Sequence, residues 1–511
     1  MNSETSIKKT TAEDVTNPED IKSRGKSRSG RSLLFWLCAV VAAVFFSVNR
    51  GSIKFGAWVL FCTIFCMACD FFKPRIFYRS DKGIILALFL LCGGISVFLL
   101  FSFANVGDVD FACYTNVMWN TLHGKFLYQS FLQQNLLAVH LMPAALVFVP
   151  FYALLGNYGL VIAQTLAWAG GLWLLLLNEK SGQGAPRLLV IGVAALPPVI
   201  APLFYGFHPD VLFFPVSAWA ILAFKKKSLL QFCLAVMLLP LIKEVFILAS
   251  LYFAFLAFWE KRSLYWSVPP ALISLTFVLM FWFVLSPALR TGSSHVFISM
   301  LPASLGGIIG QLFSHSGLFY LFSSVLIVLP ILLSHSVKLA LFPLPFFLFY
   351  TVLPDQSFHD HWRHYAFAGT WVALFSLSFC SSETLRRIAA PVFLISLCFC
   401  YSWIPLLSAP HASAQKRSAI TYAIALVSSD KKLVAHGPFM APAAERHFIM
   451  NWIYANNTWH DYDYFLYDCS FRPTWWSGRD SMDLHLRHLL ESPDWKPVFH
   501  QESIYLFKKT L

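Results

Sequence analysis

Long runs of apolar residues recur along most of this chain of 511 residues, and short polar loops separate them. Many of these runs extend for about 17 to 22 residues, the length of an α-helix that crosses the hydrocarbon core of a bilayer. The runs are continuous rather than alternating, so they predict helices and not the strands of a membrane β-barrel. We therefore expect an all-α polytopic membrane protein with roughly thirteen transmembrane helices.

Basic residues in the loops set the expected orientation of these helices. Several Lys and Arg residues precede the first apolar run, Ser32–Val48, and the basic stretch "KPRIFYRSDK" follows the second run, Ala57–Phe72. Short loops rich in Lys and Arg remain in the cytoplasm. We expect a multi-pass protein with a cytoplasmic N-terminus and an extracytoplasmic C-terminus.

One apolar segment, Asn135–Leu155, does not fit this alternation as a full span. If it crossed the membrane, the later loop that carries Lys180 and Arg187 would face outward, against the distribution of basic residues elsewhere. Pro143 and Pro150 also interrupt it, and proline breaks a helix. The segment is therefore predicted to be a re-entrant or surface-lying helical hairpin.

The hydropathy pattern divides the chain into three parts. Residues 1–31 are polar and lack periodicity, which predicts a disordered cytoplasmic tail. Residues 32–407 form the predicted transmembrane domain, and its long first extracytoplasmic loop covers residues 104–158. Residues 408–511 mix turns, charges and aromatic residues, which predicts a small extracytoplasmic α/β domain.

Short patterns within the last part predict its elements. The stretches "KKLVAHG", "DYFLYD" and "IYLFKK" are typical of strands. The stretch "SMDLHLRHLLES" has the spacing of an amphipathic helix.

The charge of the chain is explained by its topology. The formal net charge is +12, while 57% of the residues are hydrophobic and only 13% are charged. Because the basic residues concentrate in short loops, and no basic platform interleaved with aromatic residues occurs, we expect no nucleic-acid partner. The sequence contains no phosphate-binding P-loop, no GxGxxG after a strand and no HExxH motif.

Polar residues gather where the predicted topology places the outer ends of the helices. Ionisable groups are costly within a bilayer, so their convergence at one face predicts a single water-filled site. The candidates are Asp108, Asp110, His140, His208, Asp210, Lys243, Glu244, Arg363, His364 and Tyr365.

Asp110 is the candidate catalytic residue because it lies shortly after an outward-going span. A carboxylate there can accept a proton from an incoming hydroxyl or amine, or hold a divalent cation against a phosphate. Arg363 or Lys243 can stabilise that phosphate. Structural alternatives remain at this stage: Asp110 as an ordinary loop residue, Asp210 as a helix N-terminal residue and Lys243–Glu244 as a neutralised pair.

The chain resembles a family of bacterial membrane proteins of unassigned function, DUF2079, which is similar to the GT-C superfamily of lipid-sugar-dependent glycosyltransferases. The matching pieces are "DFACYTNVMWNTLHGKFLY", "HLMPAALVFVPFYALLG", "FYGFHPDVLFFP", "LIKEVFIL" and "RHYAF". Their order and spacing hold from about residue 105 to 375, and the tail after the last span also fits.

The resemblance implies a GT-C-like fold in the bacterial inner (cytoplasmic) membrane, with a polyprenyl-phosphate-linked sugar and membrane lipids as partners. It also implies that Asp110 is the catalytic acidic residue of the first extracytoplasmic loop. The family pattern often has a second acid and a glutamine about five residues on, where this chain has Thr115 and Asn116. Asn116 is a polar substitute that can bind substrate, but Thr115 cannot ionise, so the metal and any other cofactor stay unspecified.

These observations favour a glycosyltransferase that moves a sugar from a polyprenyl-phosphate-linked donor to an envelope acceptor on the extracytoplasmic face. Two other functions stay open. A lipid or polysaccharide transporter or flippase also uses buried charges and broken helices. A non-catalytic envelope assembly protein would use residues 408–511 for docking. The sequence does not indicate an oligomeric state.

Overall fold

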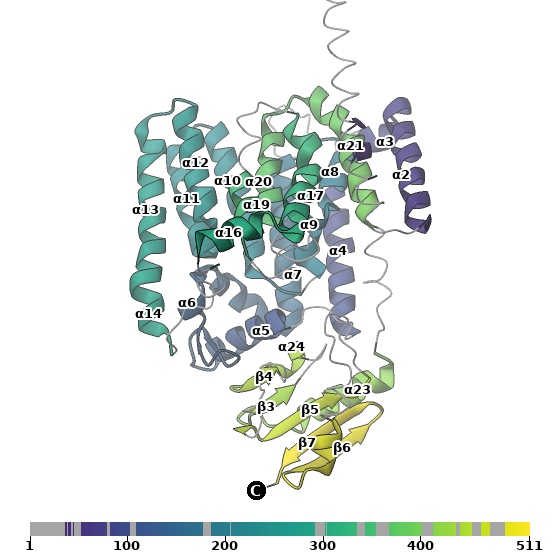
Figure 1. The fold of residues 1–511 in the computed structure, drawn as a ribbon, viewed down its shortest axis with the longest axis vertical. Coiled ribbons are helices and arrows are strands. Elements are labelled where there is room, and N and C mark those ends of the chain that lie inside the picture. The colour runs from purple at the N-terminus through teal and green to yellow at the C-terminus, as the bar shows by residue number, and fades with distance from the viewer. Residues whose placement is uncertain are drawn as a thin grey trace, which may run out of the picture.

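The computed structural model describes residues 53–78, 82–102, 109–176, 185–204, 206–291, 304–334, 343–353, 367–400, 412–435, 440–451, 461–470 and 486–510, with a few isolated residues besides. A bundle of helices makes up most of the molecule, and a small part that contains a β-sheet lies at one end of it (Figure 1). This arrangement agrees with the expected helical membrane domain followed by a small α/β part.

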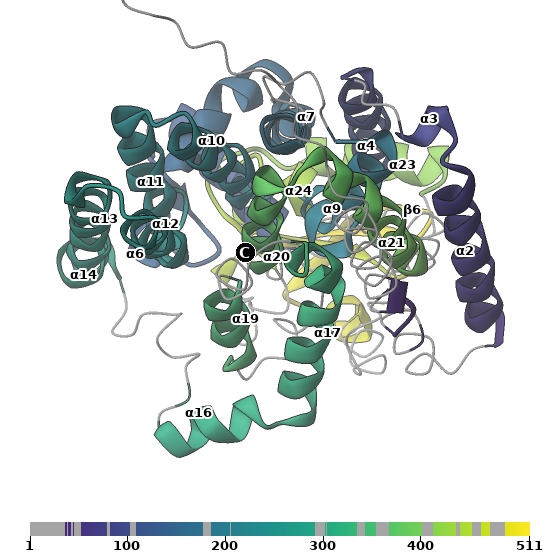
Figure 2. The same cartoon turned by 90° about the horizontal axis from the view of Figure 1, so that it is seen from above.

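The bundle begins with a peripheral helix. Figure 2 shows α2 (Ile53–Phe72) at one edge of the bundle and α13 (Val268–Met280) with α14 (Ser286–Leu289) at the opposite edge. In the described part of the chain, the other helices of the bundle longer than seven residues are α4 (Gly83–Phe101), α5 (Val109–Leu122), α7 (Val149–Leu176), α8 (Arg187–Ala194), α9 (Pro197–Phe204), α10 (Phe213–Lys225), α11 (Leu229–Ile242), α12 (Ile247–Trp259), α16 (Leu305–Leu312), α17 (His315–Leu332), α19 (Leu344–Thr351), α20 (Phe367–Leu374) and α21 (Ser382–Cys400).

The described helices provide fewer clear spans than the sequence predicts. By length and composition, four are able to cross a membrane: Gly83–Phe101, Pro143–Leu176, Leu264–Leu289 and His315–Leu332. A fifth results if α8 and α9 count as one span. The prediction of roughly thirteen spans is therefore too high by this measure. The physical reason is that many of the apolar runs form helices of 10 to 17 residues, separated by breaks.

Prolines and single-turn helices cause several of these breaks. The apolar stretch Arg187–Phe204 bends by 58° between α8 and α9, where Pro197 starts the second helix. Short 3-10 helices interrupt two further apolar stretches, namely η2 (Pro209–Leu212) before α10 and η3 (Glu244–Phe246) before α12. These two interruptions carry Asp210 and Glu244 of the candidate site.

The predicted hairpin at Asn135–Leu155 is broken in the structure as well, although it leads directly into a long helix. A one-turn helix, α6 (Leu136–Val139), and a 3-10 helix, η1 (Pro143–Phe148), precede α7. Within α7, Gly156 has φ of 58° and ψ of −141°, which is not helical and kinks the helix. The segment is therefore interrupted, but from Pro143 onward it is part of one candidate span, Pro143–Leu176, rather than of a separate re-entrant or surface-lying hairpin.

Close packing of aromatic residues stabilises the centre of the bundle. The rings of Phe214 and Trp371 lie 4.3 Å apart, and both side chains are fully buried. Large apolar side chains also cover the outside, for example Phe71, Leu154 and Phe283, each more than 70% exposed. An apolar exterior of this kind suits helices that face lipid, because lipid does not oppose the exposure of apolar surface.

The C-terminal part contains a five-stranded sheet with the strand order β4-β3-β5-β7-β6. Strands β4, β3 and β5 are parallel, whereas β7 pairs antiparallel with β5 and β6. The bounds are β3 (Leu433–Ala435), β4 (Ile449–Asn451), β5 (Tyr464–Asp468), β6 (Trp495–Gln501) and β7 (Ile504–Lys509). The three predicted strands are therefore confirmed as β3, β5 and β7, and residues 486–491 of the predicted amphipathic helix are helical.

Helices cover one face of this sheet and connect it to the bundle. Helices α23 (Ala414–Ala425) and α24 (Met440–Ala443) supply Ile420 and Met440 to a core that the sheet shares. Ala112 of α5 and Phe131 belong to the same core. Helix α5 therefore lies between the bundle and the sheet, as Figure 1 also shows. The other face has a separate core that includes Phe465, Trp495 and Leu489.

Candidate functional site

A buried ion pair and a hydrogen-bonded histidine–glutamate pair meet at the break between α11 and α12. Lys243 Nζ lies 2.8 Å from Asp210 Oδ2, and Glu244 Oε1 lies 2.8 Å from His140 Nδ1. The other carboxylate oxygen of Glu244 accepts a hydrogen bond of 2.9 Å from the backbone N–H of Leu141. Residues that are far apart in the sequence are thus brought together, as the positions of the polar residues predict.

The structure corrects the partners that the sequence suggests for the adjacent residues Lys243 and Glu244. They do not form a neutralised pair with each other, because each is bonded to a residue from another part of the chain. The backbone at Lys243 is extended, with φ of −166° and ψ of 140°. Successive side chains on extended backbone point to opposite sides, so one reaches η2 while the other reaches the segment after α6.

Asp110 extends this cluster toward solvent. It lies in the first turn of α5 and is close enough to Lys243 to interact with it electrostatically. Asp110 is partly exposed, and the side chain of His140 is 23% exposed, whereas the side chains of Asp210 and Glu244 are 3% and 5% exposed. Asp110 and His140 are therefore the more exposed members of the cluster.

The "GFHPD" turn is held by a residue that the sequence analysis missed. Gln164 of α7 donates hydrogen bonds of 2.8 Å to the carbonyls of Pro202 and Gly206, and its oxygen accepts one of 2.6 Å from the backbone N–H of His208. Gly206 has φ of 106°, a conformation that favours glycine. A lone glutamine in an otherwise apolar helix was the available signal, because a buried amide needs partners.

This turn places Asp210 in the first turn of η2, where the sequence allowed a capping role. Among the described residues no side chain caps that end, and one carboxylate oxygen of Asp210 bonds to Lys243 instead. The other oxygen, Oδ1, is buried and has no hydrogen-bond partner among the described residues. His208 is also buried, and its ring lies 6.1 Å from that of Tyr114.

A further residue of this site, Tyr350 of α19, was not predicted. It interacts electrostatically with both Asp210 and Glu244. Its position in the run "FFLFYT" gives no polar pattern to mark it.

Asn116 does not join the cluster of Asp110 and Lys243. Its amide nitrogen donates to the carbonyls of Ala444 (3.0 Å) and Arg446 (2.7 Å), and its oxygen accepts from Ser130 and Asn120. The side chain is fully buried, so its polar atoms are already occupied where α5 contacts the C-terminal part. The adjacent Thr115 donates to Asn157 at 2.6 Å.

Four predicted site residues lie outside the described residues, and the structure says nothing about them. These are Asp108, Arg363, His364 and Tyr365. Among the described residues, no group of three or more His, Cys, Asp or Glu side chains is arranged to hold a metal ion.

The chemistry of the described cluster follows from its charges. Three carboxylates, those of Asp110, Asp210 and Glu244, surround one ammonium group and one imidazole. Because Lys243 already bonds to Asp210, the cluster as described is better suited to accept a proton or a cationic group than to neutralise a phosphate. An additional cation is needed to bind an anionic leaving group at this place.

A comparison of the sequence with known families identifies the chain. Residues 101–506 match the family described as "Predicted membrane protein (DUF2079)". The chain belongs to this DUF2079 family. The resemblance expected from the sequence is therefore confirmed, and no curated protein matches the chain.

Solved structures resemble the fold of this DUF2079 protein. The crystal structure of ArnT from Cupriavidus metallidurans bound to undecaprenyl phosphate aligns with a TM-score of 0.51 and 8% sequence identity, covering 84% of this chain and 98% of that chain. The apo form of the same protein aligns with a TM-score of 0.49 and 9% identity, covering 83% and 97%. At this identity the likeness concerns the fold, and it agrees with the expected GT-C-like architecture of a multi-pass membrane protein.

Proposed function

We propose that this DUF2079 protein is a membrane glycosyltransferase that moves a sugar from a polyprenyl-phosphate-linked donor to an envelope acceptor. The observation that carries the proposal is the electrostatic interaction of Asp110 with Lys243, which is itself paired with the buried Asp210, at the end of the bundle next to the C-terminal sheet. The fold likeness to ArnT, whose crystal structure holds undecaprenyl phosphate, supports a polyprenyl-phosphate partner.

In the proposed reaction, the acceptor hydroxyl attacks the anomeric carbon of the donor sugar. The bond between that carbon and the phosphate oxygen breaks, the phosphate leaves with the bonding electrons, and Asp110 takes the proton of the attacking hydroxyl. Asp110 suits this role because it is partly exposed while the charges beside it are buried. Lys243 places a positive charge close enough to Asp110 to interact with it electrostatically.

The other predicted residues receive supporting roles in the proposal. His140 and Glu244 fix the segment before η1 beside the reacting groups. His208 and Asp210 form the floor of the site, and Asp108 and Tyr365 contact the sugar. Arg363 and His364 supply the positive charge for the donor phosphate, which the described cluster lacks. A divalent cation is the alternative source of that charge.

The proposal includes the position of the site. The N-terminus lies in the cytoplasm, and the site and residues 408–511 lie on the extracytoplasmic side of the bacterial inner membrane. The loop 104–158 then joins the site to the C-terminal part through α5. The basic loops that surround the predicted spans support this orientation.

The test is transfer by the purified full chain in lipid nanodiscs, with radiolabelled polyprenyl-phosphate sugars as donors and a bacterial envelope extract as acceptor. Asp110→Asn is expected to lower transfer by about 10²-fold or more, the usual effect of removing a general base. Asp494→Asn, an exposed aspartate in the C-terminal part, is the matched control and should transfer like wild type. Full transfer by Asp110→Asn would show that Asp110 is not catalytic. Absence of transfer by the wild type with every donor would refute the proposal that the protein is a glycosyltransferase.

A transporter or flippase is the second candidate, and one observation favours it. The apolar helices break at η2 and η3, where the buried charges lie, and discontinuous helices at a substrate site are typical of transporters. Movement of a fluorescent polyprenyl-phosphate lipid between the leaflets of proteoliposomes, without any sugar transfer, supports this alternative.

If neither lipid movement nor sugar transfer occurs, and deletion of residues 408–511 abolishes binding to envelope proteins, the chain is an assembly protein.

A further inference from the structure

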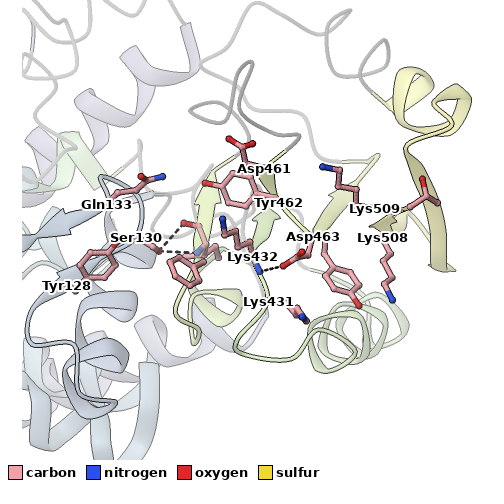
Figure 3. Close-up of a pocket in the computed structure, with 14 residues that line it drawn as sticks. Tyr128, Ser130, Gln133, Lys431, Lys432, Asp461, Tyr462, Asp463, Lys508 and Lys509 are labelled. Atoms are coloured by element: carbon pink, nitrogen blue, oxygen red, sulfur yellow. Dashed lines mark hydrogen bonds between the residues drawn. The ribbon is translucent and has the colours of Figure 1, made fainter. Parts of the chain in front are cut away.

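A polar pocket lies away from the charged cluster, between the first loop and the ends of the strands of the C-terminal sheet. Its volume is about 1020 Å³. Tyr128, Ser130 and Gln133 form one wall, on the hairpin of β1 (Tyr128–Gln129) and β2 (Gln134–Asn135). Figure 3 shows the opposite wall, which comes from the ends of the sheet strands. A pocket of this volume accommodates a ligand larger than one sugar unit.

Lysines dominate the charge of this pocket because of the strand topology. Lys431 and Lys432 precede β3, and Lys508 and Lys509 end β7. Since β7 is antiparallel to β5, its end lies beside the start of β5, where Tyr464 pairs with Lys508. Four lysines from two separate segments therefore line one pocket, which attracts an anionic ligand.

Two aspartates also line the pocket and narrow the choice of ligand. Asp461 and Asp463 precede β5, and one carboxylate oxygen of Asp463 accepts a hydrogen bond of 2.9 Å from the backbone N–H of Lys432. Carboxylates accept hydrogen bonds from hydroxyl groups but repel a dense row of phosphates. This combination disfavours a nucleic acid or an anionic membrane surface and favours a ligand with both hydroxyl groups and isolated negative charges.

Aromatic rings complete the lining. Tyr128, Phe448, Tyr462 and Tyr464 border the pocket. The Lys432 ammonium lies 5.7 Å from the Phe448 ring centre, and the Lys508 ammonium lies 6.0 Å from the Tyr464 ring centre. Aromatic rings offer flat apolar faces to the C–H surface of a sugar, while the tyrosine hydroxyls bind its polar groups.

The hairpin wall connects this pocket to the charged cluster. Ser130 Oγ lies 3.0 Å from both the N–H and the carbonyl of Ile449, which fixes the hairpin against β4. The chain then passes from β2 through α6 to His140, the partner of Glu244. An extended ligand in the pocket would thus lie on the segment that forms the candidate site.

We propose that this pocket binds an anionic oligosaccharide, such as a phosphorylated glycan. The binding of this glycan to the pocket does not depend on the proposed function. Its role as the acceptor of sugar transfer does rest on the proposed function. The lysines bind the phosphate or carboxylate groups, the aspartates bind hydroxyl groups, and the rings pack against the sugar units.

The experiment is isothermal titration calorimetry with the full chain in nanodiscs of neutral phosphatidylcholine. The three probes are phosphopentamannose, the same pentasaccharide after removal of its phosphate, and inorganic pyrophosphate. Phosphopentamannose is expected to bind at least tenfold more tightly than either of the others, because only it offers both charge and sugar.

Variants locate the binding. The double variant Lys431→Gln, Lys508→Gln and the single variant Phe448→Leu are each expected to weaken phosphopentamannose binding about tenfold or more. Lys261→Gln is the control, because Lys261 is exposed in the loop after α12 and does not line the pocket. Equal affinity for pyrophosphate and phosphopentamannose, or equal losses for the pocket variants and the control, overturns the proposal.

Binding of the glycan to the pocket is measured independently of sugar transfer. Asp110→Asn should bind phosphopentamannose like wild type, because Asp110 does not line the pocket. If Asp110→Asn keeps full transfer while the pocket variants lose binding, the proposed catalytic role fails and the binding site stands. If transfer depends on Asp110 but the three probes bind with equal affinity, the proposed glycan-binding site is refuted and the proposed catalytic role of Asp110 stands.

Discussion

Lys243 and Asp210, which are 33 residues apart in the sequence, form a buried ion pair with an N–O distance of 2.8 Å. The pair joins the break between α11 and α12 to the turn before α10. Lys243 also interacts with Asp110 and Glu244. It is therefore the central cation of a cluster that contains three carboxylates.

Because Lys243 lies at the centre of the cluster, substitution of Lys243 should destabilise the protein more than substitution of Asp210. Lys243→Met leaves three neighbouring carboxylates with only His140 to offset them, and removing one partner of a buried pair costs about 3–5 kcal/mol. Asp210→Asn leaves Lys243 with two other carboxylates, so it should lower the thermal unfolding midpoint less. The double variant Asp210→Asn, Lys243→Met should be more stable than Lys243→Met alone. Scanning fluorimetry in detergent measures this order, and equal midpoints for all three variants would contradict it.

The meeting of these residues could be predicted from the sequence, but their pairing could not. Polar residues at the ends of apolar runs indicated that Asp110, His140, Asp210 and Lys243 gather at one surface. The divergence of Lys243 from Glu244 depends on the extended backbone at Lys243, and no residue pattern marks that conformation. The span count was overestimated because hydropathy does not reveal where a 3-10 helix interrupts an apolar run.

Contacts between distant parts of the chain could not be predicted from the sequence either. Asn116 was interpreted as a substrate ligand because of its place in the family pattern. Its partners, the carbonyls of Ala444 and Arg446, lie about 330 residues further on and depend on the docking of the C-terminal part. The lysines around β3 and β7 likewise meet only because of the strand order in the sheet.

The buried amide of Asn116 predicts a structural role between α5 and the C-terminal part. Asn116→Asp keeps the shape of the side chain but loses both N–H donors and puts a carboxylate beside two carbonyls. It should therefore weaken the contact between α5 and the C-terminal part more than Asn116→Ala does. Losing buried hydrogen bonds of this kind costs about 1–3 kcal/mol each. Limited proteolysis of the full chain should release the C-terminal part faster in both variants. A cleavage rate equal to that of wild type would show that the network does not hold the two parts together.

Two adjacent glycines of α7 provide a matched test of the packing in the bundle. A Cβ atom at Gly171 would lie 2.6 Å from the Cβ of Phe214 and 3.1 Å from Trp371, whereas one at Gly170 would have nothing within 4 Å. Gly171→Ala should destabilise the bundle by about 1–3 kcal/mol through overpacking. Gly170→Ala should be neutral or stabilise it by up to about 1 kcal/mol, because alanine favours helix. Thermal unfolding in detergent distinguishes them, and a stable Gly171→Ala variant would argue against this contact between α7 and α10.

The last prediction concerns the acid sensitivity of the sheet through Asp468, at the end of β5. Burial alone would raise the pKa of Asp468, but the Lys416 ammonium at 2.6 Å and the hydroxyl groups of Ser503 and Ser470 hold that pKa below its ordinary value. A carboxylate whose pKa is depressed on folding adds stability above its unfolded pKa, and this stability is lost as the pH falls through the folded pKa. The link between α23 and β5 should therefore weaken only under acid conditions.

Hydrogen exchange of the full chain, corrected for the intrinsic exchange rate, measures the protection of β5. Wild type should be more protected than Asp468→Asn near neutral pH, by about 2 kcal/mol for a hydrogen-bonded charge. The difference should persist down to about pH 4, the ordinary pKa of aspartate, and shrink below it. Asp494→Asn is again the control, because Asp494 is exposed. A wild-type advantage that disappears between neutral pH and about pH 5 would mean that another group, and not Asp468, controls the acid response of the sheet.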